Sequence, residues 1–393
     1  MSSPATPPPR NVVLLDVADL LAPGQPLPFN VLDATGRLLL ATGQVIADGR
    51  QLDALFERGA SVSEDEVQTV RAERASAEAQ ERLAAIREPT HFDRWERHLW
   101  ALDSLLRALG RDPGQAAQVH AVVDRHLALV DHHPDAALYL CVRQDDRRFA
   151  LYGLAHALHT ATVVQLSARV LGWPPEQVRC AVGAALTMNA SIVELQARMA
   201  EQTEAPSRKQ LDDIRQHPQA AVAALKASGI TDEAWLQTVA QHHEQVGGGG
   251  YPQRVAQPGE LPRLLRAADV FMAKVSPRAA RPPMLPQLAA RQLFQQESGS
   301  PLAAALIKSV GIYPPGDFVR LRNGDIAVVS RRAQGQQPAQ AEALVDVKGR
   351  PVSESPQRDT AQADFAIASP ITDRRGLPRV LPEQVYGLLP PLD

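Results

Sequence analysis

The sequence is poor in the residues that mark several common classes of protein. Only Cys141 and Cys180 among its 393 residues are cysteines. Their number and wide separation exclude a disulfide framework and a paired-cysteine zinc motif, so we expect buried free thiols in a reducing compartment. Aromatic residues make up 4% of the chain, so Leu, Ala and Val must build most of the core. No apolar run has the length of a membrane span.

The chain also lacks a large excess of charge of either sign. The chain has 41 Lys and Arg against 44 Asp and Glu, a formal net charge of -3. This balance argues against a nucleic-acid-binding surface or a polybasic membrane patch. The opening MSSPATPPPR has no apolar signal core. We therefore expect residues 1–10 to be a disordered leader and the protein to be cytoplasmic.

Residues 11–63 have the pattern of a small α/β domain. Short apolar runs at 12–15 and 38–40 flank the turn residues 33–36. Ser63 and Glu66 have capping-box spacing, which predicts a helix start at this point. Residues 64–88 are rich in Glu, Arg and Ala and predict an exposed helix, so residues 64–135 are interpreted as a helical linker region. Apolar residues recur at helical spacing over 92–135. The histidines of this region are expected to be solvated or capping: His98, His120, His126, His132 and His133.

Residues 150–275 predict the densest helical part of the chain. Pro174-Pro175 marks one helix start, and Thr231-Asp232 marks another helix that runs into His242-His243 and ends by Gly247. After Gly311 the pattern changes. Residues 318–321 and 326–329 around Asn323-Gly324 predict a β-hairpin, and 343–347 a further strand. The fold is therefore expected to be mainly α, with a small β-rich N-terminal domain and a C-terminal β-containing extension over 313–393.

The most informative stretch is His242-His243-Glu244, followed by four glycines at 247–250 and then Tyr251-Pro252. Two imidazoles stand together where a helix meets a loop whose backbone can approach a ligand closely. A hydrophobic core does not need that arrangement, although a polar helix end followed by a flexible loop is the simpler alternative.

Residues 151–312 resemble the HD-GYP family, helical metallo-phosphohydrolases that hydrolyse cyclic di-GMP. The strongest motif is His242-His243-Glu244 with Gly250-Tyr251-Pro252; family members carry Asp-Gly where Gly247-Gly248 stands here. The resemblance implies an HD-type helical bundle core over 136–312. It also implies an interaction surface formed by Gly247, Gly250, Tyr251 and Pro252 together with Arg278 and Arg281, the two arginines facing substrate phosphates.

The family's metal ligands carry over to five positions. These are His156 ahead of Leu171-Gly172, His217 in a His-Pro pair that opens a helix, the adjacent His242 and His243, and Asp269 in Ala-Asp-Val-Phe. Each has a simpler alternative. His156 and His159 could be ordinary hydrogen-bonded histidines, and Asp269 could pair with Arg266 or Lys274.

The His-Asp pair that gives the family its name is replaced. Met188 stands where the histidine is expected and Asn189 where the aspartate is expected, and Ile192 lies near the place of a lysine. The aspartate bridges two metals in such a site, and neither a neutral amide nor a thioether substitutes well for that role. His217, His242 and His243 could still hold one divalent ion, Zn, Fe or Mn, or none.

Three hypotheses follow from these residues. The first is a degenerate HD-GYP signalling module that binds cyclic di-GMP or a partner protein such as a diguanylate cyclase, with little or no hydrolysis. The second is a weak phosphodiesterase with a three-histidine metal site. The third is a structural interaction scaffold. Metal content discriminates best among them.

Overall fold

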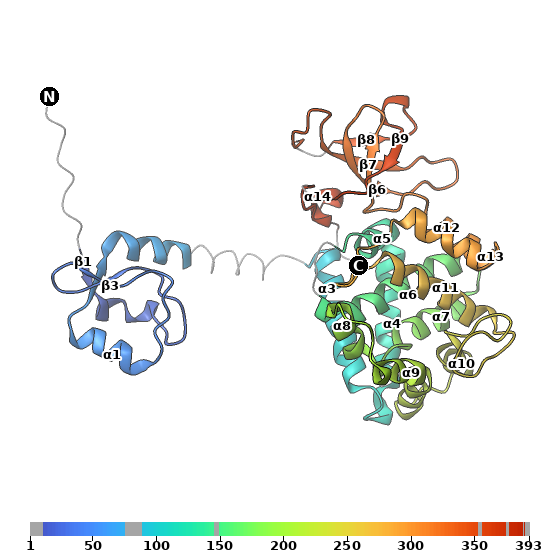
Figure 1. Ribbon diagram of the computed structural model, residues 1–393, viewed down its shortest axis with the longest axis horizontal. Coiled ribbons are helices and arrows are strands. Elements are labelled where there is room, and N and C mark those ends of the chain that lie inside the picture. Colours follow the sequence, from blue (N-terminus) through green and yellow to red (C-terminus); the bar gives the residue numbers. More distant parts are fainter. Residues whose placement is uncertain are drawn as a thin grey trace. The chain divides into compact units, whose positions relative to one another are not determined.

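The computed structural model describes residues 11–74, 89–144, 149–352, 356–374, 377–387 and 389. The chain divides into two compact units, residues 1–88 and 89–393 (Figure 1). Each has its own hydrophobic core. The predicted leader 1–10 and residues 75–88 of the predicted linker helix lie outside the described residues. Within the described ranges, no helix carries an apolar stretch of the length that a bilayer span requires.

The N-terminal unit is a small antiparallel sheet with short helices. Strands β1 (Asn11–Val13), β4 (Ser61–Ser63), β2 (Val31–Leu32) and β3 (Leu38–Leu40) pair in that order, with η1 (Leu14–Leu20) and α1 (Gly49–Glu57) beside them. A helix over 64–74 begins where Ser63 predicted it. The capping-box prediction is wrong in its detail, because both Glu66 carboxylate oxygens accept hydrogen bonds from Asn30.

The second unit is a helical bundle with its core running from Phe92 to Val310. Its helices are α3 (His91–Ala108), α4 (Ala116–His132), α5 (Pro134–Val142), α6 (Tyr152–Val170), α7 (Pro175–Thr187), α8 (Val193–Glu201), α9 (Arg208–Ala227), α10 (Glu233–Gln241), α11 (Glu260–Val275), α12 (Pro286–Gln296) and α13 (Pro301–Val310). Side-chain caps at Thr90, Ser207 and Asp232 begin three of them. Because α3 and α4 share this core, residues 91–132 are part of the bundle and not a separate spacer.

Helix α6 lies at the centre of the bundle and packs against α7, α11 and α13. Its neighbour α7 is packed so closely against α10 that no side chain fits at Gly183. An added Cβ there would lie 2.3 to 2.5 Å from the Trp235 ring. The Trp235 indole N–H donates to the Thr187 hydroxyl at 3.0 Å. This contact joins the end of α7, which precedes Asn189, to the start of α10.

The C-terminal sheet covers one end of the bundle, next to α5 (Figure 1). Strands β8 (Gln357–Asp359), β7 (Gln340–Val345), β6 (Ile326–Arg331), β5 (Phe318–Leu321) and β9 (Ile367–Pro370) pair in that order, followed by α14 (Pro382–Tyr386). The predicted hairpin is β5 and β6, paired in antiparallel fashion. The Tyr139 hydroxyl on α5 donates to the Val380 carbonyl at 2.9 Å, and Gln287 on α12 donates to the fully buried Asp317 at 2.6 Å. The sheet is therefore fixed to the helices.

The expectation of solvated or capping histidines in α3 and α4 is wrong for His98 and His126, both fully buried. The Thr162 hydroxyl donates to the Leu158 carbonyl at 2.9 Å, so its oxygen is left to accept from Nε2 of His126 at 3.4 Å. Nδ1 of His126 then accepts from Nε2 of His98 at 3.3 Å. A threonine on α6, rather than solvent, thus partners the His126 ring, while Nδ1 of His98 is buried without a hydrogen-bond partner. No local sequence pattern indicates this arrangement.

Acid should therefore destabilise the second unit. Burial first, and the nearby Arg125 second, lower the pKa of His98 from 6.5 to about 3, so the unfolded chain binds a proton at mild acidity that the folded chain excludes. Stability from this group is complete above pH 6.5 and falls as the pH drops toward 3, by about 2 kcal/mol at pH 5. We expect denaturant unfolding to show His98→Phe less pH-dependent than the parent between pH 8 and 5 by about this amount. Equal pH dependence in the two proteins would contradict the assignment.

Candidate functional site

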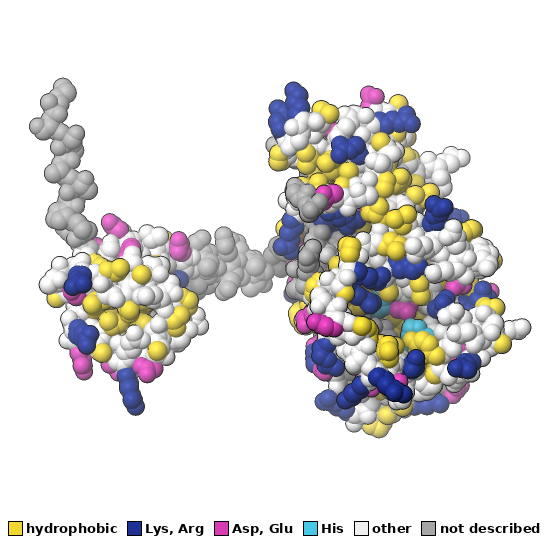
Figure 2. All heavy atoms as spheres, in the orientation of Figure 1, with side chains coloured by type: hydrophobic (Ala, Val, Ile, Leu, Met, Phe, Trp, Pro, Cys, Tyr) yellow, Lys and Arg dark blue, Asp and Glu magenta, His cyan; other side chains and the backbone are white. Residues whose placement is uncertain are grey.

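A small cavity in the bundle gathers most of the candidate residues. Its volume is about 150 Å³. Its lining comes from α6, the α7–α8 turn, α8, α9, the loop after α10, α11 and the segment after α11: Tyr152, His156, Asn189, Ile192, Leu195, Gln196, Met199, Ile214, His217, His243, Tyr251, Asp269, Ala273 and Arg278. Figure 2 shows histidine side chains reaching the surface of this unit at one place, beside an acidic side chain and with Lys and Arg around them.

His217 lies in the middle of α9 and not at its start, so the prediction that His217-Pro218 opens a helix is wrong. The Ser207 capping box begins the helix, and Pro218 is accommodated inside it. Pro218 has no N–H to donate to the Ile214 carbonyl four residues earlier. Nδ1 of His217 donates to the Ile214 carbonyl instead, at 2.6 Å. The proton is thereby held on Nδ1, and Nε2 is left with a free lone pair.

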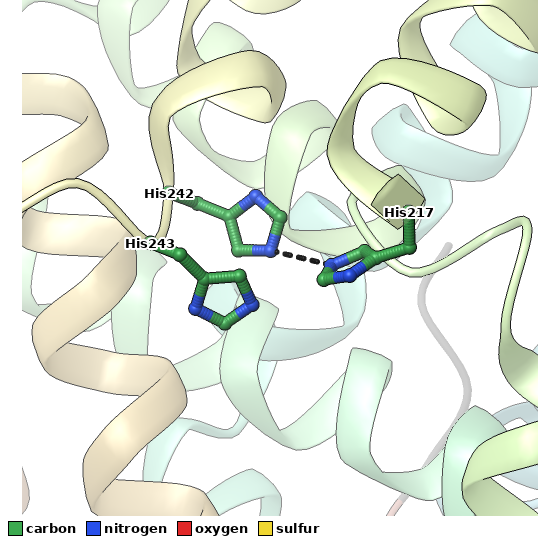
Figure 3. Close-up of side chains that lie close together, drawn as sticks. All are labelled: His217, His242 and His243. Atoms are coloured by element: carbon green, nitrogen blue, oxygen red, sulfur yellow. Dashed lines mark hydrogen bonds between the residues drawn. The ribbon is translucent and has the colours of Figure 1, made fainter. Parts of the chain in front are cut away.

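His242 is held in the same way. It follows the last residue of α10, and its Nδ1 donates to the Val239 carbonyl at 2.7 Å. Its Nε2 then faces Nε2 of His217 at 3.0 Å (Figure 3). Two lone pairs at this distance repel each other unless a cation lies between or beside them. The residues thus fit a divalent metal, which would supply Lewis acidity to a bound phosphate ester.

His243 completes a group of three. One ligand atom from each of His217, His242 and His243 lies within 4.8 Å of the other two, and the three rings converge in Figure 3. Burial lowers the pKa of His217 to about 3, and burial is also the main cause that lowers the pKa values of His242 and His243. The rings are therefore neutral at physiological pH, the form that binds metal.

His156 and Asp269 form a pair of their own beside this group. Nε2 of His156 lies 2.7 Å from the Asp269 carboxylate. Burial alone would raise the pKa of Asp269, but the hydrogen bond from His156, with the nearby His243 and His242, outweighs burial and lowers it. Asp269 is also 4.0 Å from Nδ1 of His243. The simpler alternative for Asp269 does not hold, because Arg266 pairs with Glu297 and Lys274 donates to Gln292 and Gln296.

Met188, Asn189 and Ile192, the three positions predicted to be substituted, do not all lie in the cavity. Met188 is fully buried in the hydrophobic core, whereas Asn189 and Ile192 line the cavity. An uncharged amide and an aliphatic side chain thus stand in the cavity near His217 and Asp269. Among the residues that line the cavity, Asp269 supplies the one carboxylate.

Arg278 and Arg281, the two arginines predicted to face phosphates, lie in different places. Arg278 lines the cavity, where its guanidinium donates to the Tyr152 hydroxyl at 2.6 and 3.1 Å and lies over the Tyr152 ring. Arg281 donates to the Ala273 carbonyl and is not among the lining residues. Tyr152, which sequence reasoning missed, stacks on His156 with ring centroids 5.7 Å apart. Its position one helical turn before His156 was the available signal.

The glycine loop borders a second hollow. An open groove of about 900 Å³ is lined by Gly250, Tyr251, Pro252 and Arg254 of the loop and by Arg215, Gln216, Gln219 and Ala220 of α9. Tyr251 lines both the groove and the small cavity. Gly247 and Gly248 have φ of +90° and +78°, a region that side chains disfavour. The loop thus forms the wall between an inner cavity and an outer groove.

Comparisons with known proteins agree with this arrangement. The profile of the HD domain family matches residues 140–301, which hold all five candidate metal ligands. This segment is an HD domain. The cyclic di-GMP phosphodiesterase PA4108 of Pseudomonas aeruginosa is 28% identical over 224 residues, which cover 55% of this chain and 53% of that protein. The chain thus spans about half the length of this relative.

A solved structure is also similar. It is Bd1817, an HDG"Y"P protein from Bdellovibrio bacteriovorus, with a TM-score of 0.44 and 14% identity over 76% of this chain and 97% of the other.

His242→Ala should abolish high-affinity metal binding by the HD domain. It removes one of three neutral ligands, and two imidazoles hold a divalent ion poorly. We expect elemental analysis after dialysis against Zn, Fe or Mn to show at least about a tenfold loss of affinity with the helical fold retained. His132→Ala, in a histidine that lies outside the three-histidine group, is the matched control. Unchanged metal content in His242→Ala would refute the three-histidine assignment.

Proposed function

We propose that this chain is a cyclic di-GMP signalling protein whose degenerate HD-GYP domain binds the dinucleotide with little or no hydrolysis. One observation carries the proposal: Asn189 lines the cavity where a bridging carboxylate is required, while the three histidines and Arg278 remain. The neutral amide lowers the affinity for a second dication. Without two metals the site lacks the bridged water that serves as nucleophile.

The sizes of the two hollows support binding through one phosphate. A cavity of about 150 Å³ is too small for a whole dinucleotide, since ligand pockets usually measure about 300 Å³ or more. A phosphate can enter beside Arg278, whose fork geometry suits phosphate oxygens. The rest of the ligand would then lie past Tyr251 in the outer groove, where Arg215 and Arg254 supply positive charge.

Calorimetry with cyclic di-GMP tests this proposal. Arg278→Ala should weaken binding by at least about tenfold, the value of one charge-assisted hydrogen-bonded pair. Arg281→Ala should have a smaller effect, because its guanidinium donates to the Ala273 carbonyl, and it serves as the matched control. Equal affinities of Arg278→Ala and the parent would remove Arg278 from the site. No heat from either protein would favour docking of a partner protein, such as a diguanylate cyclase, on the loop 247–252.

A weak one-metal phosphodiesterase is the second candidate. It is favoured by the facing lone pairs of His217 and His242 at 3.0 Å, an arrangement that a cation stabilises. Near-stoichiometric metal together with slow turnover would support it. A chain that binds neither metal nor nucleotide would leave the role of a structural scaffold.

A further inference from the structure

Glu244 is a buried carboxylate that neither the metal site nor the nucleotide site uses. Only 1% of the residue is exposed. Its oxygens accept three backbone hydrogen bonds, from the N–H groups of Gln253 at 2.7 Å, Arg254 at 3.0 Å and Val255 at 3.0 Å. A buried carboxylate is costly without such partners. The three N–H groups therefore bind an anion that the chain itself supplies.

The hydrogen bonds from residues 253–255 to Glu244, called the clamp below, hold the loop close to His242 and His243. A side chain at Gly250 is impossible, since its Cβ would lie 2.5 Å from the His243 carbonyl oxygen and from Cα of Glu244. Arg254 has φ of +57°, unusual for a residue with a side chain, and its N–H is one of those that Glu244 holds. Glycine at 250 and glutamate at 244 thus serve one purpose, close contact between the loop and the end of α10.

This closure places an aromatic ring on a metal-holding imidazole. Tyr251 stacks on His243 with ring centroids 4.6 Å apart and an angle of 24° between the planes. His243 is the most exposed of the three histidines, and Nδ1 of His243 makes no bond to a carbonyl like those that hold His217 and His242. The His243 ring also lies beside the His242 ring, with centroids 4.1 Å apart, and stacking on Tyr251 is the ring contact that the loop supplies.

We propose that Glu244 is a positioning residue: its carboxylate clamps residues 253–255 and, through Tyr251, orients His243 at the edge of the metal site. The part that concerns metal affinity rests on the proposed three-histidine site. The part that concerns the loop does not, so the two can fail separately.

Fluorine NMR of the full chain labelled with 3-fluorotyrosine tests the clamp without metal or nucleotide. The chain has five tyrosines, and loss of one signal in Tyr251→Phe assigns the reporter. In Glu244→Gln an amide N–H₂ faces backbone N–H donors, so the loop should open. We expect the Tyr251 signal to move to the position of an exposed tyrosine, and trypsin to cleave after Arg254 at least about tenfold faster. Glu342→Gln, in a buried glutamate of β7, should change neither. An unmoved Tyr251 signal in Glu244→Gln would overturn the proposal.

A second variant tests whether Glu244 acts through Tyr251. Tyr251→Leu keeps the carboxylate and removes the stacked ring. It should weaken Zn binding by about as much as Glu244→Gln does, on the order of tenfold, without faster cleavage at Arg254. Zn affinity that falls in Glu244→Gln and stays at the parent value in Tyr251→Leu would disprove the route through His243. A parent that binds no Zn would remove the three-histidine site, while the fluorine signal and the cleavage rate still decide the clamp.

Discussion

Asn189→Asp should raise the affinity of the HD domain for divalent metal by at least about tenfold, the effect expected of one well-placed carboxylate. Asn189 lines the cavity with His217 and Asp269, so the new charge enters the metal site directly. Only 4% of Asn189 is exposed, so an unpaired carboxylate there is costly and the metal-free variant should be less stable than the parent. A larger rise in melting temperature on adding Mn or Fe is the measurement.

Gln196→Glu is the matched control, since it brings the same charge into the same cavity from α8. A gain as large as that of Asn189→Asp would mean that charge alone raises the affinity. Met188→His combined with Asn189→Asp restores both members of the missing pair, and we expect more metal per chain and measurable cyclic di-GMP hydrolysis, which the parent should lack. A folded double variant with the metal content of the parent would disprove the assignment of Met188 and Asn189.

Gly183→Ala should strongly destabilise the helical unit, although alanine is the better helix former by about 1 kcal/mol. The new methyl group would lie 2.3 to 2.5 Å from three atoms of the Trp235 ring, which is buried and hydrogen-bonded to Thr187. Overpacking of this kind costs about 1–3 kcal/mol or more. We expect a net loss of about 2 kcal/mol in unfolding free energy and a melting temperature lower by about 4–8 °C.

Two further variants isolate the cause. Gly249→Ala, whose new methyl group would meet nothing closer than 3.7 Å, should leave the melting temperature nearly unchanged. Trp235→Phe in the Gly183→Ala background provides room for the methyl group, so the second substitution should cost less than it does in the parent. A Gly183→Ala protein as stable as the parent would show that α7 and α10 can separate, and the packing described between them would be wrong.

The sequence predicted local features better than distant ones. Pro175, Asp232 and the Asn323-Gly324 turn each act within a few residues, so the helix starts and the hairpin follow from local rules. The burial of His98 was not predictable, because it depends on Thr162, which lies on another helix and reaches it through His126.

The candidate site shows the same division. The two adjacent histidines are visible in the sequence because they are neighbours in it. That His217 meets His242 depends on how α9 packs beside α10. The local pair His217-Pro218 suggests a helix start, but it lies inside α9. The pairing of Asp269 with His156 rather than Arg266 depends on α6 and α11 lying side by side.

Pro218 has a consequence that reaches beyond this chain. Its side chain is apolar. Because it lacks a backbone N–H, the Ile214 carbonyl accepts from Nδ1 of His217, and the imidazole therefore carries its proton on Nδ1. Any other amino acid at position 218 would have a backbone N–H that competes for the Ile214 carbonyl. The His217 ring could then flip and carry its proton on either nitrogen. A histidine followed by proline inside a helix can thus hold its ring proton on Nδ1 and leave Nε2 free to bind a metal. The same pair could be placed in the helix of a designed metal site.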